Sequence, residues 1–132
     1  MKNNGATVHI TLQGKGGIGK TMVSALLAQY LKQNSTKVAC YDADPVNSSL
    51  GAFTKLEAKR VTLMQDGEIN SRVFDQVFEE IISLDHSAVI DCGASSFVPL
   101  AKYLMDNETF QFLESHGKKV LIHCPIAGGQ SL

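Results

Sequence analysis

The sequence predicts an α/β fold, a doubly wound and mostly parallel sheet with helices on both faces. Short apolar strands alternate with helical stretches along the chain, which is the order that builds such a sheet. These strands are apolar throughout rather than apolar at every second residue, as is typical of strands covered on both faces. A glycine-rich loop also joins the first strand to the first helix, as in the first unit of many such folds.

The glycine-rich loop fits the pattern G-x-x-x-x-G-K-[ST], whose backbone N–H groups wrap the phosphates of a nucleotide. Its residues are Gly14, Lys15, Gly16, Gly17, Ile18, Gly19, Lys20 and Thr21. Glycines are needed because the main chain must approach phosphate oxygens without a Cβ. We expect Lys20 to bridge the β- and γ-phosphates and Thr21 to give its hydroxyl to Mg²⁺.

The segments on either side of the loop have the order that phosphate binding requires. Residues 7–12 are rich in β-branched residues and predict a buried strand. After the loop, apolar residues recur at helical spacing: Val23, Leu26, Leu27, Tyr30 and Leu31. The start of this helix adds the positive end of its dipole to the anion site.

The remaining elements continue the alternation. Strands are expected at 37–41, 60–63, 88–91 and 119–124. Helices are expected from the capping residue Asn70 onward and over 100–113, with a turn at 65–67 between the third strand and the first of these helices.

Three carboxylates follow the predicted strands. Asp42 and Asp44 end the second strand, and Asp91 ends the fourth. Ligands of parallel sheets lie outside the carboxyl ends of the strands, where the loop also lies. We expect Asp91 to hold Mg²⁺ through water, and Asp42 and Asp44 to order the attacking water and the metal shell. The alternatives are an exposed strand-end acid for Asp91 and a plain Asp-Pro turn for the other two.

Composition sets limits on the remaining functions. The 132 residues suit one domain, and a net charge of −1 gives no basic field for nucleic acid, so direct DNA binding is not evident. No apolar run reaches the length of a membrane span, and no secretory segment opens the chain, so we expect a cytoplasmic protein without membrane contact.

The three cysteines are widely spaced and form no C-x-x-C pair, which disfavours a metal or disulfide role. We expect Cys40, Cys92 and Cys124 to be buried thiols late in their strands. The alternative is that all three crowd the nucleotide end of the sheet.

The loop with its two lysines, followed by residues 42–45 and 89–93, resembles the deviant Walker A ATPases of the ParA/MinD class. Residues 12–17, 68–72 and 91–100 are more narrowly similar to the TraL family of plasmid conjugal-transfer ATPases and their StbB-like relatives. The resemblance covers the whole chain but only the first part of the family. It implies that residues 1–132 form a single P-loop domain, cut short after the fifth strand, of a longer protein.

The resemblance implies ATP binding, slow Mg²⁺-dependent hydrolysis and an ATP-dependent homodimer. Lys15, which from its position alone is a solvated lysine, would reach across the dimer to the partner's phosphates. Asp44 would belong to the first switch near the attacking water, with Asn47 near the phosphates. The class commonly has a second hydroxyl residue where this chain has Met22, whose backbone N–H still has the position to donate.

The function implied is an ATP-driven dimerisation switch in plasmid conjugal transfer or DNA positioning, with other plasmid transfer or partition proteins as partners. Two alternatives stay open: a nucleotide-binding module without turnover, and a small-molecule kinase or synthetase, for which no acceptor-binding residues stand out. An iron–sulfur reductase of the nitrogenase type is disfavoured. That family has a cysteine where this chain has Phe97, Val98 and Pro99.

Overall fold

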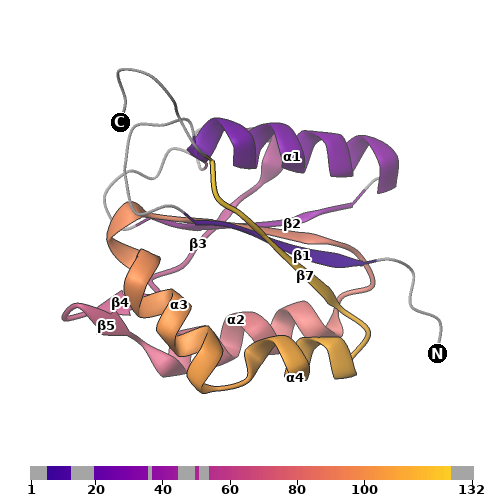
Figure 1. Cartoon of the computed structure of the whole chain (residues 1–132). Helices are drawn as coiled ribbons and strands as arrows, with labels where there is room; N and C mark the ends of the chain where they lie inside the picture. Colours follow the sequence, from indigo (N-terminus) through magenta and orange to yellow (C-terminus); the bar gives the residue numbers. More distant parts are fainter. Residues whose placement is uncertain (1–5, 13–19, 36, 45–49, 51–53, 126–132) are drawn as a thin grey trace.

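A computed structural model describes residues 6–12, 20–35, 37–44, 50 and 54–125. It contains a five-stranded sheet in the order β3-β2-β6-β1-β7, and every neighbouring pair is parallel (Figure 1). The strands are β1 (Thr7–Thr11), β2 (Ala39–Ala43), β3 (Lys59–Arg60), β6 (Ala88–Cys92) and β7 (Lys119–His123). The predicted parallel α/β fold is confirmed.

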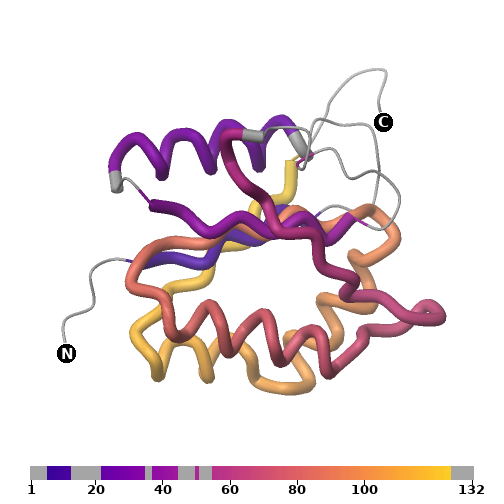
Figure 2. Tube along the Cα trace, turned by 180° about the vertical axis from the view of Figure 1, so that it is seen from behind, coloured from indigo at the N-terminus to yellow at the C-terminus, as the bar shows by residue number. Residues whose placement is uncertain are grey.

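Helices cover both faces of this sheet. Of the α-helices that the structure describes, α1 (Lys20–Ser35) lies on one face of the sheet and the other three lie on the opposite face. Both views show this arrangement (Figures 1 and 2). The three are α2 (Ser71–Ser83), α3 (Phe97–Asp106) and α4 (Thr109–Ser115). None of the helices in the described residues combines the length and apolarity needed to cross a membrane.

Local sequence signals account for several element boundaries. Asn70 caps α2 because its side chain accepts a hydrogen bond from the N–H of Val73 at 3.3 Å. Asp66 and Gly67 both have positive φ, as a tight hairpin turn requires, and they join β4 (Met64–Gln65) to β5 (Glu68–Ile69). Two short 3₁₀ turns, η2 (Thr54–Leu56) and η3 (Ala94–Ser96), complete the described elements.

Two predicted elements are shorter than expected. The strand expected over 60–63 pairs with β2 only through Lys59 and Arg60, after which the chain turns into the hairpin. The single helix expected over 100–113 is two helices, α3 and α4. Glu108 lies between them with a left-handed φ of 51°, which interrupts the helix.

The two faces of the sheet are packed differently. Large apolar side chains such as Ile10, Ile90 and Leu104 fill the layer beneath α2, α3 and α4. Helix α1 packs through small residues, since Ser24, Ala25 and Ala28 are fully buried. Within the predicted apolar stripe of α1, Leu27 and Leu31 pack against the core. Leu26 and Tyr30 do not, because they are 60% and 63% exposed.

The expected burial of the cysteines is correct for two of the three. Cys40 and Cys92 are buried, but Cys124 is exposed because it follows β7, an edge strand of the sheet. The three thiols do not crowd one end of the sheet, since Cys40 is the second residue of β2 rather than a late one.

Candidate functional site

A row of polar residues crosses the sheet where four strands end. Asp42 of β2 is in register with Asp91 of β6, Asp91 with Thr11 of β1, and Thr11 with His123 of β7. Residues in register point to the same face of a sheet. Two residues earlier on the strands, Cys40 and Val89 pack with α1, so the row faces α1.

Asp91 is fully enclosed, with 0% of its surface exposed. Its Oδ1 accepts hydrogen bonds from the hydroxyls of Thr11 at 3.1 Å and Ser24 at 3.0 Å. The two hydroxyl oxygens lie 2.5 Å apart, and the Thr11 hydroxyl also reaches the carbonyl oxygen of Ile90 at 3.2 Å. A buried carboxylate needs such donors, because burying a charge without partners costs several kcal/mol.

Asp42 and Asp44 are also buried, at 1% and 6% exposed. The backbone N–H of Asp44 donates to Asp42 Oδ1 at 3.2 Å, which forms a local turn at the end of β2. Asp42 is therefore buried, and its side chain stabilises the turn that begins at this residue. The exposed strand-end alternative is wrong for Asp91, and both residues of the predicted pair lie inside the protein.

The glycine loop joins two elements that the structure describes. Strand β1 ends at Thr11 and α1 begins at Lys20, as the strand-loop-helix order predicts. Gly14, Lys15, Gly16, Gly17, Ile18 and Gly19 lie outside the described residues, as does Asn47. The side chains of Lys20 and Thr21 also lie outside the description, although both residues belong to the first turn of α1.

Met22 is the third residue of α1, so its N–H belongs to the first turn, where backbone donors have no partner within the helix. Its side chain is 66% exposed. The backbone of this residue therefore has the position expected of a phosphate-binding amide, and the side chain does not fill the interior of the site.

Two histidines lie next to this row on β1 and β7. His9 Nδ1 and His123 Nε2 are 2.9 Å apart, one of them carrying the shared proton, and the rings stack with centroids 5.2 Å apart. Burial, together with the nearby His123, lowers the pKa of His9 from 6.5 to about 4. The His9 ring is therefore neutral near pH 7.

The donor chemistry at the strand ends suits Mg²⁺. The groups brought together are carboxylate and hydroxyl oxygens, the ligands that hard cations prefer, and no thiol lies among them. In the described part of the chain, no three His, Cys, Asp or Glu residues are arranged to hold a metal ion by themselves.

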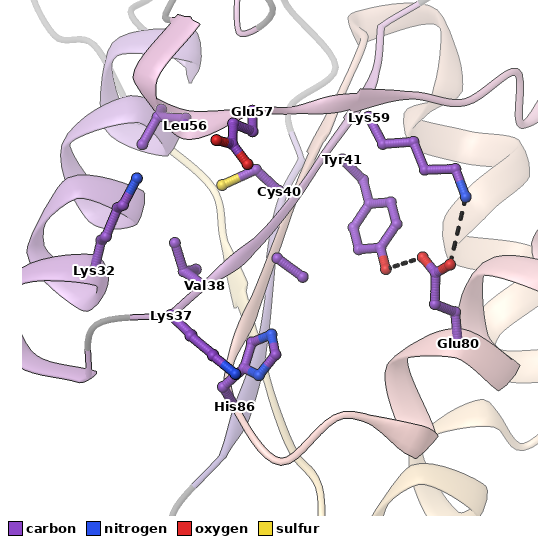
Figure 3. Close-up of a pocket in the computed structure, with 11 residues that line it drawn as sticks. Lys32, Lys37, Val38, Cys40, Tyr41, Leu56, Glu57, Lys59, Glu80 and His86 are labelled. Atoms are coloured by element: carbon purple, nitrogen blue, oxygen red, sulfur yellow. Dashed lines mark hydrogen bonds and ion pairs between the residues drawn. The ribbon is translucent and has the colours of Figure 1, made fainter.

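A separate cavity of about 340 Å³ lies beside the first half of β2, and Figure 3 shows the residues that line it. Tyr41 and Lys59 both point at Glu80, to which the Tyr41 hydroxyl donates at 2.5 Å and Lys59 Nζ donates at 3.4 Å (Figure 3). The bond from Tyr41 lowers the pKa of Glu80, while burial raises that of Tyr41.

This cavity lacks the features of a phosphate-acceptor pocket. It is lined by residues 37–41, which enter and form β2, and by Lys32, Leu56, Glu57, Lys59, Glu80 and His86. The lining includes none of Asp42, Asp44 and Asp91. Its one thiol, Cys40, is held neutral because burial raises its pKa to about 11. The cavity therefore gives no support to the kinase or synthetase alternative.

Sequence reasoning missed Thr11 and Ser24, the two hydroxyl donors to Asp91. They lie 80 and 67 residues from Asp91 along the chain, so no local pattern links them. Only the positions of the two residues in the sequence could have indicated this role. Ser24 follows Thr21 by one helical turn, and Thr11 is a polar residue at the end of an otherwise apolar strand.

Comparisons with known proteins show the family to which the chain is related. Residues 10–114 match the family described as the CobQ/CobB/MinD/ParA nucleotide binding domain. The chain is 42% identical to Protein TraL of Escherichia coli over 127 residues, which are 96% of this chain and 53% of that protein. The two TraL proteins match nearly the whole of this chain, but the chain spans only about half of their length.

More distant relatives match shorter segments. An uncharacterized ATP-binding protein of Methanocaldococcus jannaschii is 41% identical over 66 residues, 50% of this chain and 25% of that protein. An iron-sulfur cluster carrier protein of Rickettsia conorii is 34% identical over 88 residues, 63% of this chain and 26% of that protein. No solved structure matches the chain.

The family match covers most of the chain, from the end of β1 through the loop and α1 to the strands that carry Asp42 and Asp91. The resemblance to the ParA/MinD class is thereby confirmed. This chain belongs to the family of CobQ/CobB/MinD/ParA nucleotide-binding domains.

Proposed function

We propose that this chain binds ATP with Mg²⁺ and forms the nucleotide-dependent part of a slowly hydrolysing dimerisation switch in plasmid conjugal transfer or plasmid DNA positioning. The observation that carries the proposal is the meeting of Asp42, Asp91 and α1 at one end of the sheet. Carboxylates on neighbouring strand ends, beside a helix that follows a glycine loop, suit a metal-bound triphosphate.

The parts of the chain have distinct tasks in this proposal. Backbone N–H groups from Gly14 to Met22 hold the phosphate oxygens, and Lys20 neutralises the β- and γ-phosphates. Thr21 and Asp91 hold the hydrated Mg²⁺, with Asp44 beside them. When bound, Mg²⁺ offsets charge that develops on the phosphate oxygens during transfer.

The buried acids and the switch residues would control the water. Asp44, placed by the turn at the end of β2, orients the water that attacks the γ-phosphate, and Asp42 holds Asp44 through its backbone. Asn47 contacts the phosphates when the first switch closes. Lys15 reaches the triphosphate of the partner subunit, so the homodimer forms only when ATP is bound.

The cellular role rests on similarity alone. The relationship to Protein TraL agrees with the sequence resemblance to plasmid conjugal-transfer ATPases. We propose other plasmid transfer or partition proteins as partners and the cytoplasm as the place of action, with no direct DNA contact by this chain.

A second candidate is a nucleotide-binding module without turnover. The length comparison favours this module, because the chain spans 53% of the length of Protein TraL. Residues beyond the matched half would then supply hydrolysis.

Calorimetric titration of ATP, ADP and GTP, each with and without Mg²⁺, tests the proposal. We expect binding of ATP and ADP that Mg²⁺ strengthens, and weaker binding of GTP. Phosphate release measured on the same sample separates the two candidates, because the module without turnover binds ATP and releases no phosphate. Absence of nucleotide binding would exclude both.

A further inference from the structure

We propose that Ser24 and Thr11 are positioning residues for the metal end of the nucleotide site. Their hydroxyls hold the Asp91 carboxylate and fasten the first turns of α1 to the ends of β1 and β6. This inference rests on the proposed function of Asp91 and adds two residues that the phosphate-loop pattern does not contain.

The contacts form a closed triangle of oxygens. Ser24 Oγ lies 3.0 Å and Thr11 Oγ1 lies 3.1 Å from the same oxygen of Asp91, and the two hydroxyls lie 2.5 Å apart. All three residues are 0% exposed. Three separate elements, β1, α1 and β6, therefore meet in one buried polar contact, and neither helix nor strand shifts without breaking it.

The placement of Ser24 connects this triangle to the metal. Ser24 lies three residues after Thr21 on α1, so the two residues lie on the same side of the helix, one turn apart. A bond from Ser24 to Asp91 thus fixes the distance between the turn that carries Thr21 and the carboxylate expected to share its metal ion. Thr11 has no such connection, because it lies on β1.

The number of hydroxyl protons limits how many contacts of the triangle are hydrogen bonds at one time. Each hydroxyl has one proton, so the two protons cannot occupy all three edges of the triangle at once. The two protons are therefore shared among the Asp91 carboxylate, the neighbouring hydroxyl and the Ile90 carbonyl oxygen, which the Thr11 hydroxyl also reaches. If either hydroxyl is removed, the remaining one still donates to Asp91. Of these two hydroxyls, the one of Ser24 ties α1 to that carboxylate.

Two substitutions therefore have different expected effects. Ser24→Ala removes the tie between α1 and Asp91, and Thr11→Val keeps it while removing a hydroxyl of the same triangle. We expect the strengthening of ATP binding by Mg²⁺ to fall about tenfold in Ser24→Ala and by less than about threefold in Thr11→Val. ATP affinity without Mg²⁺ is expected to stay within about twofold of the wild type in both variants, because the phosphate-binding loop is untouched.

The experiment is calorimetric titration of ATP with and without Mg²⁺ on four variants and the wild type. Ser24→Thr restores a hydroxyl at the same position and is expected to recover the Mg²⁺ effect. Thr109→Val is the matched control, since it removes a buried threonine hydroxyl in α4, away from the strand ends. Electron paramagnetic resonance of Mn²⁺ in place of Mg²⁺, with ADP bound, reports the metal shell independently of turnover.

The outcomes separate this inference from the proposed function. If the wild type binds no nucleotide, or binds it equally well with and without Mg²⁺, the proposed Mg²⁺–ATP site is wrong. If the wild type behaves as proposed but Ser24→Ala keeps the full Mg²⁺ effect and the Mn²⁺ spectrum, only the positioning role is overturned. A loss of ATP affinity that is equal with and without Mg²⁺ would also overturn it, because general damage to the fold predicts that result.

Discussion

Thr11 and Asp91 face each other across the β1–β6 ladder, and the Thr11 hydroxyl donates to Asp91 Oδ1 at 3.1 Å. The contact places the end of the strand before the glycine loop against the strand-end acid of a parallel neighbour. Ser24 joins it from α1 at 3.0 Å. The two segments that flank residues 13–19 are thus fixed to the same carboxylate, which anchors both ends of the loop.

The two lysines of the loop are expected to act in different subunits. Lys20→Ala removes a phosphate contact within the subunit, so ATP affinity falls, whereas Lys15→Ala leaves it within about threefold of the wild type. In a longer protein that contains this chain, Lys15→Ala abolishes ATP-dependent dimerisation and turnover. Calorimetry and sedimentation velocity with ATP make both measurements. An equal loss of ATP affinity in the two variants contradicts the role of Lys15 in the partner subunit.

Asp44 is expected to act on the attacking water. In the longer protein, Asp44→Ala lowers the rate of hydrolysis about a hundredfold and leaves the protein trapped with ATP bound, because ATP still binds but the water is not oriented. Single-turnover hydrolysis of labelled ATP measures this. Asp75→Ala, which removes an exposed acid on α2, is the matched control. Unchanged hydrolysis in Asp44→Ala would show that the residue only shapes the turn.

The His9–His123 pair gives the fold a dependence on acid pH. The folded-state pKa of His9 is about 4 and the usual value is 6.5, so the unfolded chain takes up a proton first as pH falls. The stability that neutral His9 contributes is therefore fully present above about pH 6.5 and is lost as the pH falls from 6.5 to about 4. Below pH 4 this contribution no longer changes. The expected loss is on the order of 2 to 3 kcal/mol.

Urea unfolding of the wild type and of His9→Gln at pH 7 and pH 5 measures this loss. Glutamine is neutral at both pH values, so the variant is expected to show a smaller decrease in the free energy of unfolding. Parallel pH profiles for the two proteins would assign the acid sensitivity to other groups.

Ser96 carries a buried hydroxyl that has no hydrogen-bond partner among the described residues. The residue is 1% exposed and lies in η3 just after β6. An unsatisfied buried polar group costs about 1 to 3 kcal/mol, so Ser96→Ala is expected to raise the free energy of unfolding by about 1 kcal/mol. Ser24→Ala is expected to lower it, because that hydroxyl is bonded. Urea titration compares the two, and a destabilised Ser96→Ala would mean that the hydroxyl has a partner in solution.

The edge strand β7 is expected to cause association that does not require ATP. Leu121 and Ile122, on opposite faces of β7, are 39% and 40% exposed, and no described strand pairs with its outer edge. Open apolar edges pair with other chains. Sedimentation of the wild type and of Leu121→Lys, without nucleotide, tests this, because a lysine on the edge opposes pairing. A monomeric wild type at all concentrations rules it out.

Much of the fold follows from local chemistry. The Asn70 cap, the Asp66–Gly67 turn and the apolar strands each depend on residues close together in the sequence. The helix break at Glu108 was not predictable, since a glutamate rarely adopts a left-handed φ. Cys124 was placed wrongly because its exposure depends on which strand lies at the edge, a property of the whole sheet.

Some residues of the candidate site were predictable from the sequence and others were not. Asp42, Asp44 and Asp91 were identified because parallel strands place their carboxyl ends together whatever the intervening sequence. Thr11 and Ser24 depend on the register between β1 and β6 and on the rotation of α1, which no short pattern encodes. Exposed Leu26 and Tyr30 show the same limit, because spacing gave the helix but not the face that it buries.

The most direct test is a crystal structure of the chain with a non-hydrolysable ATP analogue and Mg²⁺. The predicted result is a triphosphate held by the backbone N–H groups of residues 14–21, with Mg²⁺ between Thr21 and a water on Asp91. A nucleotide bound elsewhere, or a loop whose N–H groups point away from the phosphates, would contradict it.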